Sequence, residues 1–200
     1  MRRILVSALV LSAALSLAAC NRQAQAPKPP PKPVAVAPNV PPAPAQPAAR
    51  GFRHAAGLDL FGYYFPQGDV MFGNFKLRQL NLGSAEEFEG YEKGQRISPN
   101  YAPVMLEFDD VTSPQKENEL GQTYHEVSRR VLPDSYEVTA QSITFHGHDE
   151  ILGEVAFEGQ LDTAALARVR SGGPEEPVLK GVVSAMRQKL NRAFVWFGGD

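Results

Sequence analysis

Val104-Met105-Leu106-Glu107-Phe108-Asp109-Asp110-Val111 is the alternating segment, in the middle of the chain, that decides the fold class. Every second residue at its start is apolar, so Val104, Leu106 and Phe108 share one face of an extended chain. Glu107 and Asp109 fall on the opposite face. A period of two with one apolar face predicts a half-buried β-strand.

The same kind of signal recurs on both sides of this segment. Apolar, β-branched and aromatic runs are separated by short clusters of Gly, Pro, Asn and Asp. We expect a hairpin across the turn 66–69, a turn at Pro133-Asp134, and a connection through 146–149. The further strands predicted in this way are 58–65, 71–82, 123–132, 136–145, 154–161, 178–186 and 192–197.

Two short helices interrupt the strands. Ser84 is a predicted N-cap with Glu87 as its capping-box partner, and the helix should end by Gly94. Asp162 caps the second helix, which ends at 172–174. The fold class is therefore mainly β, an antiparallel sandwich or open barrel of about eight strands with two short helices. A two-layer α+β fold is the alternative if a helix packs across the sheet.

The N-terminus has the pattern of an export signal. Arg2 and Arg3 precede an apolar stretch, 4–17, which is too short for a transmembrane helix of about 20 residues. The stretch ends in Leu17-Ala18-Ala19-Cys20, which resembles the lipobox of bacterial lipoproteins at all four positions. An ordinary secretory signal cut near Ala19 is the alternative.

The lipobox resemblance implies cleavage before Cys20 and acylation of its thiol, which anchors the chain to a lipid bilayer. Asn21 occupies the position where many lipoproteins of the inner membrane carry Asp, so the resemblance favours the outer membrane, facing the periplasm. Cys20 is the only cysteine, so no disulfide can form within the chain.

Composition divides the chain into a signal peptide (1–19), a lipidated cysteine with a tether (20–50), and one domain (51–200). Residues 21–50 contain ten prolines and eight alanines but no acidic or aromatic residue. Such a segment is predicted to stay unfolded, with an extended reach of about 3.1 Å per residue.

Charge follows the same division. The tether carries four basic residues, whereas the part after residue 50 has 22 acidic against 14 basic residues, a net charge of −8. Nucleic-acid binding needs a clustered basic face, which this acidic domain does not offer. We therefore expect no nucleic-acid partner.

Catalytic motifs are missing from the sequence: it has no G-x-S-x-G, Walker, H-E-x-x-H or dinucleotide pattern. The strongest metal candidate is His146, His148 and Asp149, with further ligands such as His125 or Glu126 from elsewhere. The alternative is a polar hairpin loop. We predict no cofactor and no enzymatic activity, with a metal-dependent hydrolase as an alternative.

Aromatic residues are concentrated at the start of the domain. Seven of the chain's 18 aromatic residues lie within 24 positions, and Phe61, Tyr63, Tyr64 and Phe65 place rings on both faces of one strand. One face is then exposed as a protein or glycan interface, or the strand is buried on both sides.

Tether and domain together suggest a non-enzymatic binding module whose partner is another envelope or secreted protein. The combination of lipobox, Pro/Ala tether and acidic β domain resembles immunity or inhibitor lipoproteins that block secreted toxins, a likeness of architecture that transfers no residues. A structural or assembly lipoprotein of an envelope or secretion machine is the other alternative.

Overall fold

The computed structural model describes residues 51–199. The predicted signal peptide, Cys20 and the proline-rich tether lie outside this range. Within it, neither helix has the length and apolarity needed to cross a membrane.

The domain consists of thirteen strands and two helices. The helices are α1 (Ala85–Glu92) and α2 (Thr163–Arg170). The strands are β1 (Phe52–His54), β2 (Gly62–Pro66), β3 (Met71–Phe72), β4 (Phe75–Leu82), β5 (Val104–Asp110), β6 (Gln115–Glu117), β7 (Thr123–His125), β8 (Ser128–Val131), β9 (Pro133–Val138), β10 (Ser142–Asp149), β11 (Gly153–Leu161), β12 (Pro177–Ala185) and β13 (Gln188–Phe197).

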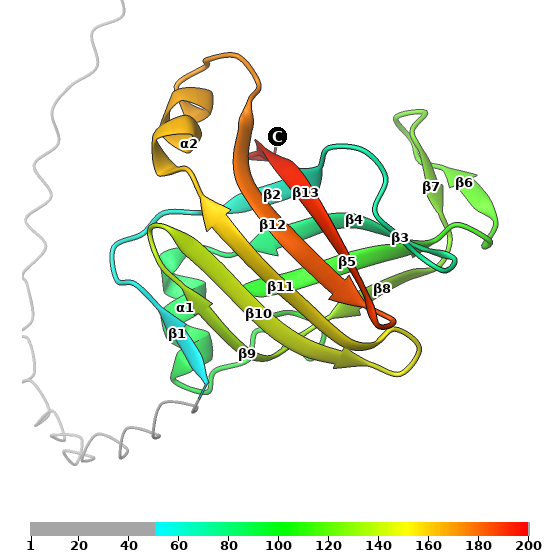
Figure 1. Ribbon diagram of the computed structural model, residues 1–200, viewed down its shortest axis with the longest axis horizontal. Coiled ribbons are helices and arrows are strands. Elements are labelled where there is room, and N and C mark those ends of the chain that lie inside the picture. Colours follow the sequence, from blue (N-terminus) through cyan, green and yellow to red (C-terminus); the bar gives the residue numbers. More distant parts are fainter. Residues whose placement is uncertain (1–50, 200) are drawn as a thin grey trace, which may run out of the picture. The chain divides into compact units, whose positions relative to one another are not determined.

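Ten strands form one strongly curled sheet, a half-barrel, in the order β1-β9-β10-β11-β12-β13-β2-β4-β5-β8, with β3 paired to β4 beside this path. β1 runs parallel to β9, and the other neighbours in the sheet are antiparallel. Figure 1 shows β9 to β13 in front of β2, β4, β5 and β8, with both helices at the margin of the sheet. β6 and β7 form a separate two-stranded hairpin.

One stretch of chain connects the two sides of the curled sheet. β8 pairs with β5, and after Leu132 the chain continues as β9, which pairs with β10. Gly147 on β10 lies so close to the carbonyl group of Leu132 that no Cβ could fit there. Arg129 of β8 adds a tie to β10, since its Nε lies 3.0 and 2.9 Å from the two carboxylate oxygens of Asp149.

The interior of the half-barrel is filled with side chains. The inward positions of the alternating strands carry aromatic and aliphatic residues that are almost fully buried. The largest of them are Tyr64, Phe72, Phe108, Phe145, Phe157, Phe194, Leu77, Leu80, Leu82, Leu106, Ile143 and Leu152.

α1 packs against the edge that β1 and β9 form. The ring of His54 on β1 stacks on Phe88 with centroids 4.9 Å apart, and its Nδ1 lies 2.9 Å from Oε1 of Glu92. Tyr136 on β9 donates to the same carboxylate oxygen at 3.3 Å. These contacts fix α1 on the sheet margin.

The structure confirms a mainly β domain with two short helices. The predicted capping box of Ser84 and Glu87 is present, and Asp162 accepts a hydrogen bond from the amide of Ala165 as the second cap. The sheet is mixed rather than purely antiparallel, because β1 adds in parallel, and it is one curled sheet rather than the two sheets of a sandwich.

Two predicted turns are wrong. Pro133 starts β9 instead of a turn, and the reversal comes at Thr139, whose hydroxyl accepts from the amide of Ser142. His146 to Asp149 belong to β10, so the reversal into β11 comes after Asp149. Pairing between β9 and β10 explains both differences. It extends from Val138 opposite Ile143 to Pro133 opposite Gly147, so Pro133 and residues 146–147 lie within strands and not in turns.

Candidate functional site

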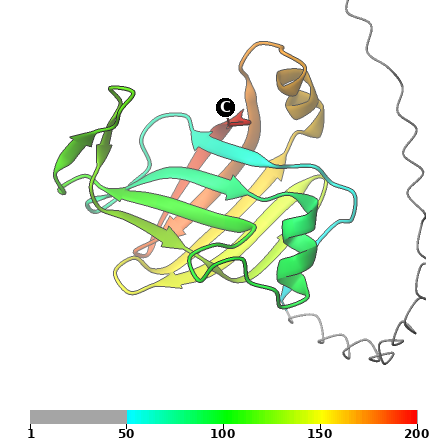
Figure 2. The same cartoon turned by 180° about the vertical axis from the view of Figure 1, so that it is seen from behind.

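The outward face of the sheet formed by β13, β2, β4, β5 and β8 carries an open hollow of about 590 Å³. Figure 2 turns the outward side of β2, β4, β5 and β8 toward the reader. We call this feature the hollow and define it by its lining residues, Tyr63, Phe65, Arg78, Gln79, Asn81, Tyr101, Met105, Glu107, Gln122, Arg130 and Phe197.

The floor of the hollow is polar and sheltered. Gln79, Asn81 and Glu107 are 8%, 7% and 5% exposed, although they point away from the core. Strand register explains their grouping, because Gln79 lies opposite Glu107 and Asn81 lies opposite Met105 across the β4–β5 ladder. Buried polar side chains that serve no core packing are unusual and call for a functional explanation.

Glu107 is the centre of the floor. Its Oε2 accepts a hydrogen bond from Nε2 of Gln79 at 3.1 Å. Its Oε1 lies 3.5 Å from Nη1 of Arg78 and 3.8 Å from Nε of Arg130. Charge-assisted pairs are normally about 2.7–2.9 Å long, so neither arginine is tightly bonded to this carboxylate.

A β-bulge places two successive residues of β4, Arg78 and Gln79, at the hollow. The register of β4 against β5 shifts between Leu77 and Gln79, so Gln79 lies opposite Glu107 and Arg78 is the extra residue. Nη1 of Arg78 lies 3.5 Å from Oε1 of Glu107 and 3.9 Å from Oδ1 of Asp109. Oδ1 of Asp109 is buried and has no hydrogen-bond partner within residues 51–199.

Aromatic rings form the rim. Tyr63 and Phe65 of β2 lie opposite Phe197 and Val195 of β13, and the rings of Phe65 and Phe197 have centroids 6.3 Å apart. Burial and a hydrogen bond to Glu87 raise the pKa of Tyr101, so its hydroxyl stays protonated. The rim therefore combines apolar ring faces with the neutral phenol group of Tyr101.

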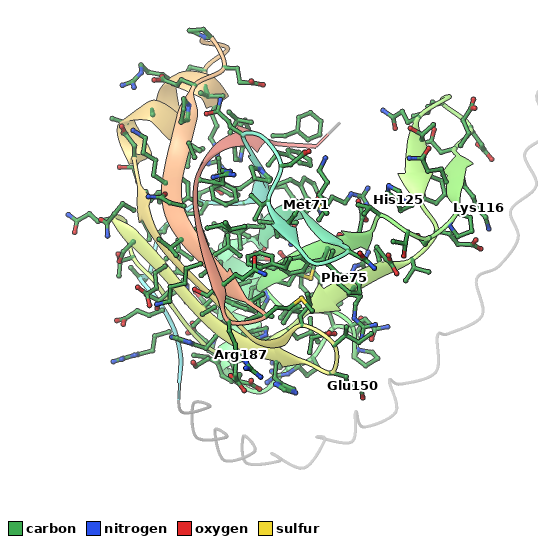
Figure 3. The ribbon with its side chains drawn as sticks, turned by 45° about the vertical axis from the view of Figure 1, so that its right-hand side comes forward. Met71, Phe75, Lys116, His125, Glu150 and Arg187 are labelled. Atoms are coloured by element: carbon green, nitrogen blue, oxygen red, sulfur yellow. The ribbon has the colours of Figure 1, made fainter. Side chains whose placement is uncertain are left out.

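The β6–β7 hairpin stands beside the hollow and contributes Gln122 to its lining. We call residues 114–126 the arm. It connects β5 to β8, and Figure 3 shows it, with Lys116 and His125, projecting from the domain beyond Met71 and Phe75. Its turn is ordered by Asn118, whose Oδ1 accepts from the amides of Leu120 and Gln122 at 3.0 and 2.9 Å.

Apolar side chains of the arm and its base face solvent. Leu120 is 82% exposed at the tip, and Tyr124 and Val127 are also exposed. Lys116 pairs with Glu126 across the base of the hairpin. An ordered hairpin that holds apolar groups in water is typical of a contact surface.

The four aromatic residues predicted as an interaction surface divide between the two faces of β2. Tyr64 is fully buried, and its hydroxyl donates to the carbonyl of Leu60 at 2.8 Å. Tyr63 and Phe65 point outward into the hollow, and Phe61 lies exposed before the strand, near α2. Tyr64 is thus a core residue, whereas Tyr63 and Phe65 lie on the outward face of the same strand.

The predicted metal ligands are separated by the pleat of β10. His146 and His148 are exposed on the same side, as two residues with one between them must be. Asp149 instead pairs with Arg129 and accepts from the amides of Ile151 and Leu152, both at 2.9 Å. No group of three His, Cys, Asp or Glu in the described range is placed to hold a metal ion.

Asp149 has an ionised, structural role. Burial by itself would raise its pKa, but hydrogen bonds from the amides of Leu152 and Ile151, together with Arg129, hold that pKa below its ordinary value. The carboxylate is therefore occupied by the turn and by the tie to β8.

Sequence reasoning missed the floor of the hollow. The alternation of β5 predicts a solvent-facing side for Glu107, and no motif in the sequence marks Arg78, Gln79 or Asn81 as part of a site, whereas Glu107, Gln79 and Asn81 are all buried. The signal present in the sequence is the alternation of polar residues within two apolar strands, but only the register of β4 against β5 groups them.

No protein-family model, curated protein or solved structure with which the chain was compared gives a match. The hollow offers hydrogen-bond donors and acceptors, two cationic groups and aromatic faces on one side of the sheet. These are groups that can hold a ligand.

Proposed function

We propose that the protein is a membrane-anchored periplasmic lipoprotein whose β domain is a non-enzymatic protein-binding module. The binding face is the hollow together with the arm. A lipid anchor on Cys20, in the outer membrane, would restrict the domain to the envelope and raise its local concentration near an envelope or secreted partner.

The observation that carries this proposal is the residue composition of the hollow. Protein interfaces are enriched in Tyr, Phe, Met and Arg around sheltered pockets, and Lys is depleted there. The hollow contains two tyrosines, two phenylalanines, one methionine and two arginines, and no lysine. The exposed apolar residues of the arm extend the same surface.

Photo-crosslinking in intact cells tests the proposal. Benzoylphenylalanine would replace Phe197 at the rim or Tyr124 on the arm, both of which are exposed. The affinity tag belongs in the tether segment, which is distant in sequence from the rim residue Phe197. The matched control is the same replacement at Glu158, which is exposed on β11, outside the lining of the hollow.

We expect one dominant crosslinked protein from Phe197 and Tyr124 and none from Glu158. Equal crosslinking from all three positions, or none from any, would contradict a specific protein-binding face. If one dominant protein is crosslinked, its identity would decide between an inhibitor of a secreted toxin and a component of an envelope assembly.

A further inference from the structure

We infer that the hollow receives an acidic group of the protein partner: a carboxylate, carried on an otherwise uncharged segment, that binds between Arg78 and Arg130. The inference rests on the proposed function, since it names the chemistry that the partner brings to the same face.

The first argument is local charge. The lining of the hollow contains two arginines and one glutamate, a net charge of +1, in a domain whose net charge is −8. Asp109 lies beside this lining, 3.9 Å from Nη1 of Arg78, with 17% of its side chain exposed. The side chains of Arg78 and Arg130 are 44% and 51% exposed, whereas the side chain of Glu107 is 7% exposed. An approaching ligand therefore meets the positive groups first.

The second argument is the hydrogen-bonding capacity that the arginines keep. Arg78 approaches Glu107 with one Nη atom and Arg130 with its Nε, at 3.5 and 3.8 Å. Guanidinium has five N–H donors in a planar fork that matches a carboxylate. Most donors of both side chains thus remain for a ligand.

A second arginine–carboxylate pair in the same domain shows what a tight contact looks like here. Nε of Arg129 lies 3.0 and 2.9 Å from the two oxygens of Asp149, and that carboxylate also accepts two backbone amides. Glu107 has no comparable set of partners. Its contacts orient the two arginines without consuming them.

Glu107 is itself held in place. Gln79 donates to its Oε2, so the carboxylate cannot swing away from the floor. A fixed negative charge below two cations keeps both guanidinium groups at the mouth of the hollow and lowers the entropy cost of ordering them on binding.

The surroundings limit what carries the acidic group. The rings of Tyr63, Phe65 and Phe197 can cover the carbon skeleton of a peptide segment. The charge of −8 on the whole domain opposes a strongly acidic partner. A single carboxylate between apolar neighbours fits both conditions.

Titration of the whole mature chain, residues 20–200, with small defined ligands tests this inference. The ligands are three capped tripeptides with leucine on both sides of glutamate, glutamine or lysine, and inorganic phosphate. Side-chain Nε–H resonances of the arginines report which guanidinium groups are touched. The variants are Arg78→Gln, Arg130→Gln and Glu107→Gln, with Arg53→Gln as the matched control, because Arg53 lies 4.0 Å from Glu137 outside the hollow.

We expect the glutamate peptide to shift the signals of Arg78 and Arg130 and to bind at least about tenfold more tightly than the glutamine peptide. Either arginine replacement in the hollow should remove most of this preference, and Arg53→Gln should not. Glu107→Gln should strengthen binding by about threefold, because the loss of a competing negative charge outweighs the loss of arginine ordering through contacts of 3.5 and 3.8 Å.

Other results would overturn the inference. Tighter binding of the lysine peptide, or loss of the glutamate peptide in Glu107→Gln, would make the hollow a cation site. Phosphate binding as tight as that of the peptide would make it a site for a free anion. No binding of any ligand at the highest soluble concentration would also end it.

The inference and the proposed function fail separately. A partner that crosslinks at Phe197 but keeps its affinity in Arg78→Gln and Arg130→Gln would leave the protein-binding module standing without the acidic group. Peptide binding with no crosslinked protein would leave a carboxylate site without a protein partner.

Discussion

Arg129 and Arg130 are neighbours on β8, yet they point to opposite sides of the sheet and belong to different kinds of site. Arg129 points inward at the end of the half-barrel and makes a close pair with Asp149 on β10. Arg130 points outward and stays 3.8 Å from Glu107. Arg129 thus connects β8 to β10, and Arg130 is one of the two arginines that we propose to bind a ligand.

The same contrast runs through the aromatic residues of β13. Phe194 is fully buried and stacks edge-on with Phe157 at 5.5 Å, whereas Phe197, three positions later, is 44% exposed at the rim of the hollow. The buried side chains on the inner face of the sheet thus contribute most of the stability of the domain. The outer face carries groups whose removal should cost little stability.

The largest expected difference is between these two phenylalanines. Phe194→Ala should lower the free energy of unfolding by about 3–5 kcal/mol, because it leaves a cavity in a filled core. Phe197→Ala should lower it by less than about 1 kcal/mol. Urea unfolding followed by circular dichroism measures both, and similar losses would contradict the division between the two faces.

The adjacent arginines give the next comparison. Arg129→Ala should lower the free energy of unfolding by about 2–3 kcal/mol, because it leaves the largely buried carboxylate of Asp149 without its cationic partner. Arg130→Ala removes a half-exposed side chain and should cost less than about 0.5 kcal/mol. Equal costs would show that Glu107 is a structural pair like Asp149.

Acid pH should weaken the Asp149 tie. The folded protein holds the pKa of Asp149 below its ordinary value, despite the opposing effect of burial, through the amides of Leu152 and Ile151 and through Arg129. The stabilisation is therefore complete above the unfolded pKa of about 3.9 and is lost as the pH falls through the folded pKa.

Unfolding free energies of the wild type and of Asp149→Asn between neutral and strongly acidic pH measure this effect. The difference between the two proteins should shrink as the pH falls below about 4. A difference that stays constant over this range would show that the ionised carboxylate is not what ties β10 to β8.

Local signals in the sequence were sufficient for parts of the fold. The caps at Ser84 and Asp162 depend on neighbouring residues, and the structure has both. β5 is a strand as predicted, but it is not half-buried, because Met105 and Glu107 on its outward face are buried as well. The break between β9 and β10 depends on pairing with distant strands, so the signal at Pro133 was misleading. Three-residue strands such as β1 and β6 carry too few positions for a period to be read.

The hollow could be predicted only in part. Tyr63 and Phe65 were noticed as aromatic residues, but the floor consists of residues from β4 and β5 that meet only through register. Burial of Glu107 also depends on long side chains from other strands, and the sequence of one strand does not show which side chains these are.

The last comparison sets Glu107 against Asp149. Glu107→Gln should change the free energy of unfolding by less than about 1 kcal/mol, because burial disfavours the carboxylate while its arginine contacts are long. The amide oxygen of the new glutamine can still accept from Gln79. Asp149→Asn at neutral pH is the matched control, and it should cost more, since Asp149 is tightly paired.

A loss above about 2 kcal/mol in Glu107→Gln would place Glu107 in the same structural class as Asp149 and remove the reason to assign the floor to binding. A near-neutral effect has the opposite meaning. It would leave Glu107 without a structural role comparable to that of Asp149, as the proposed binding of a ligand by Arg78 and Arg130 requires.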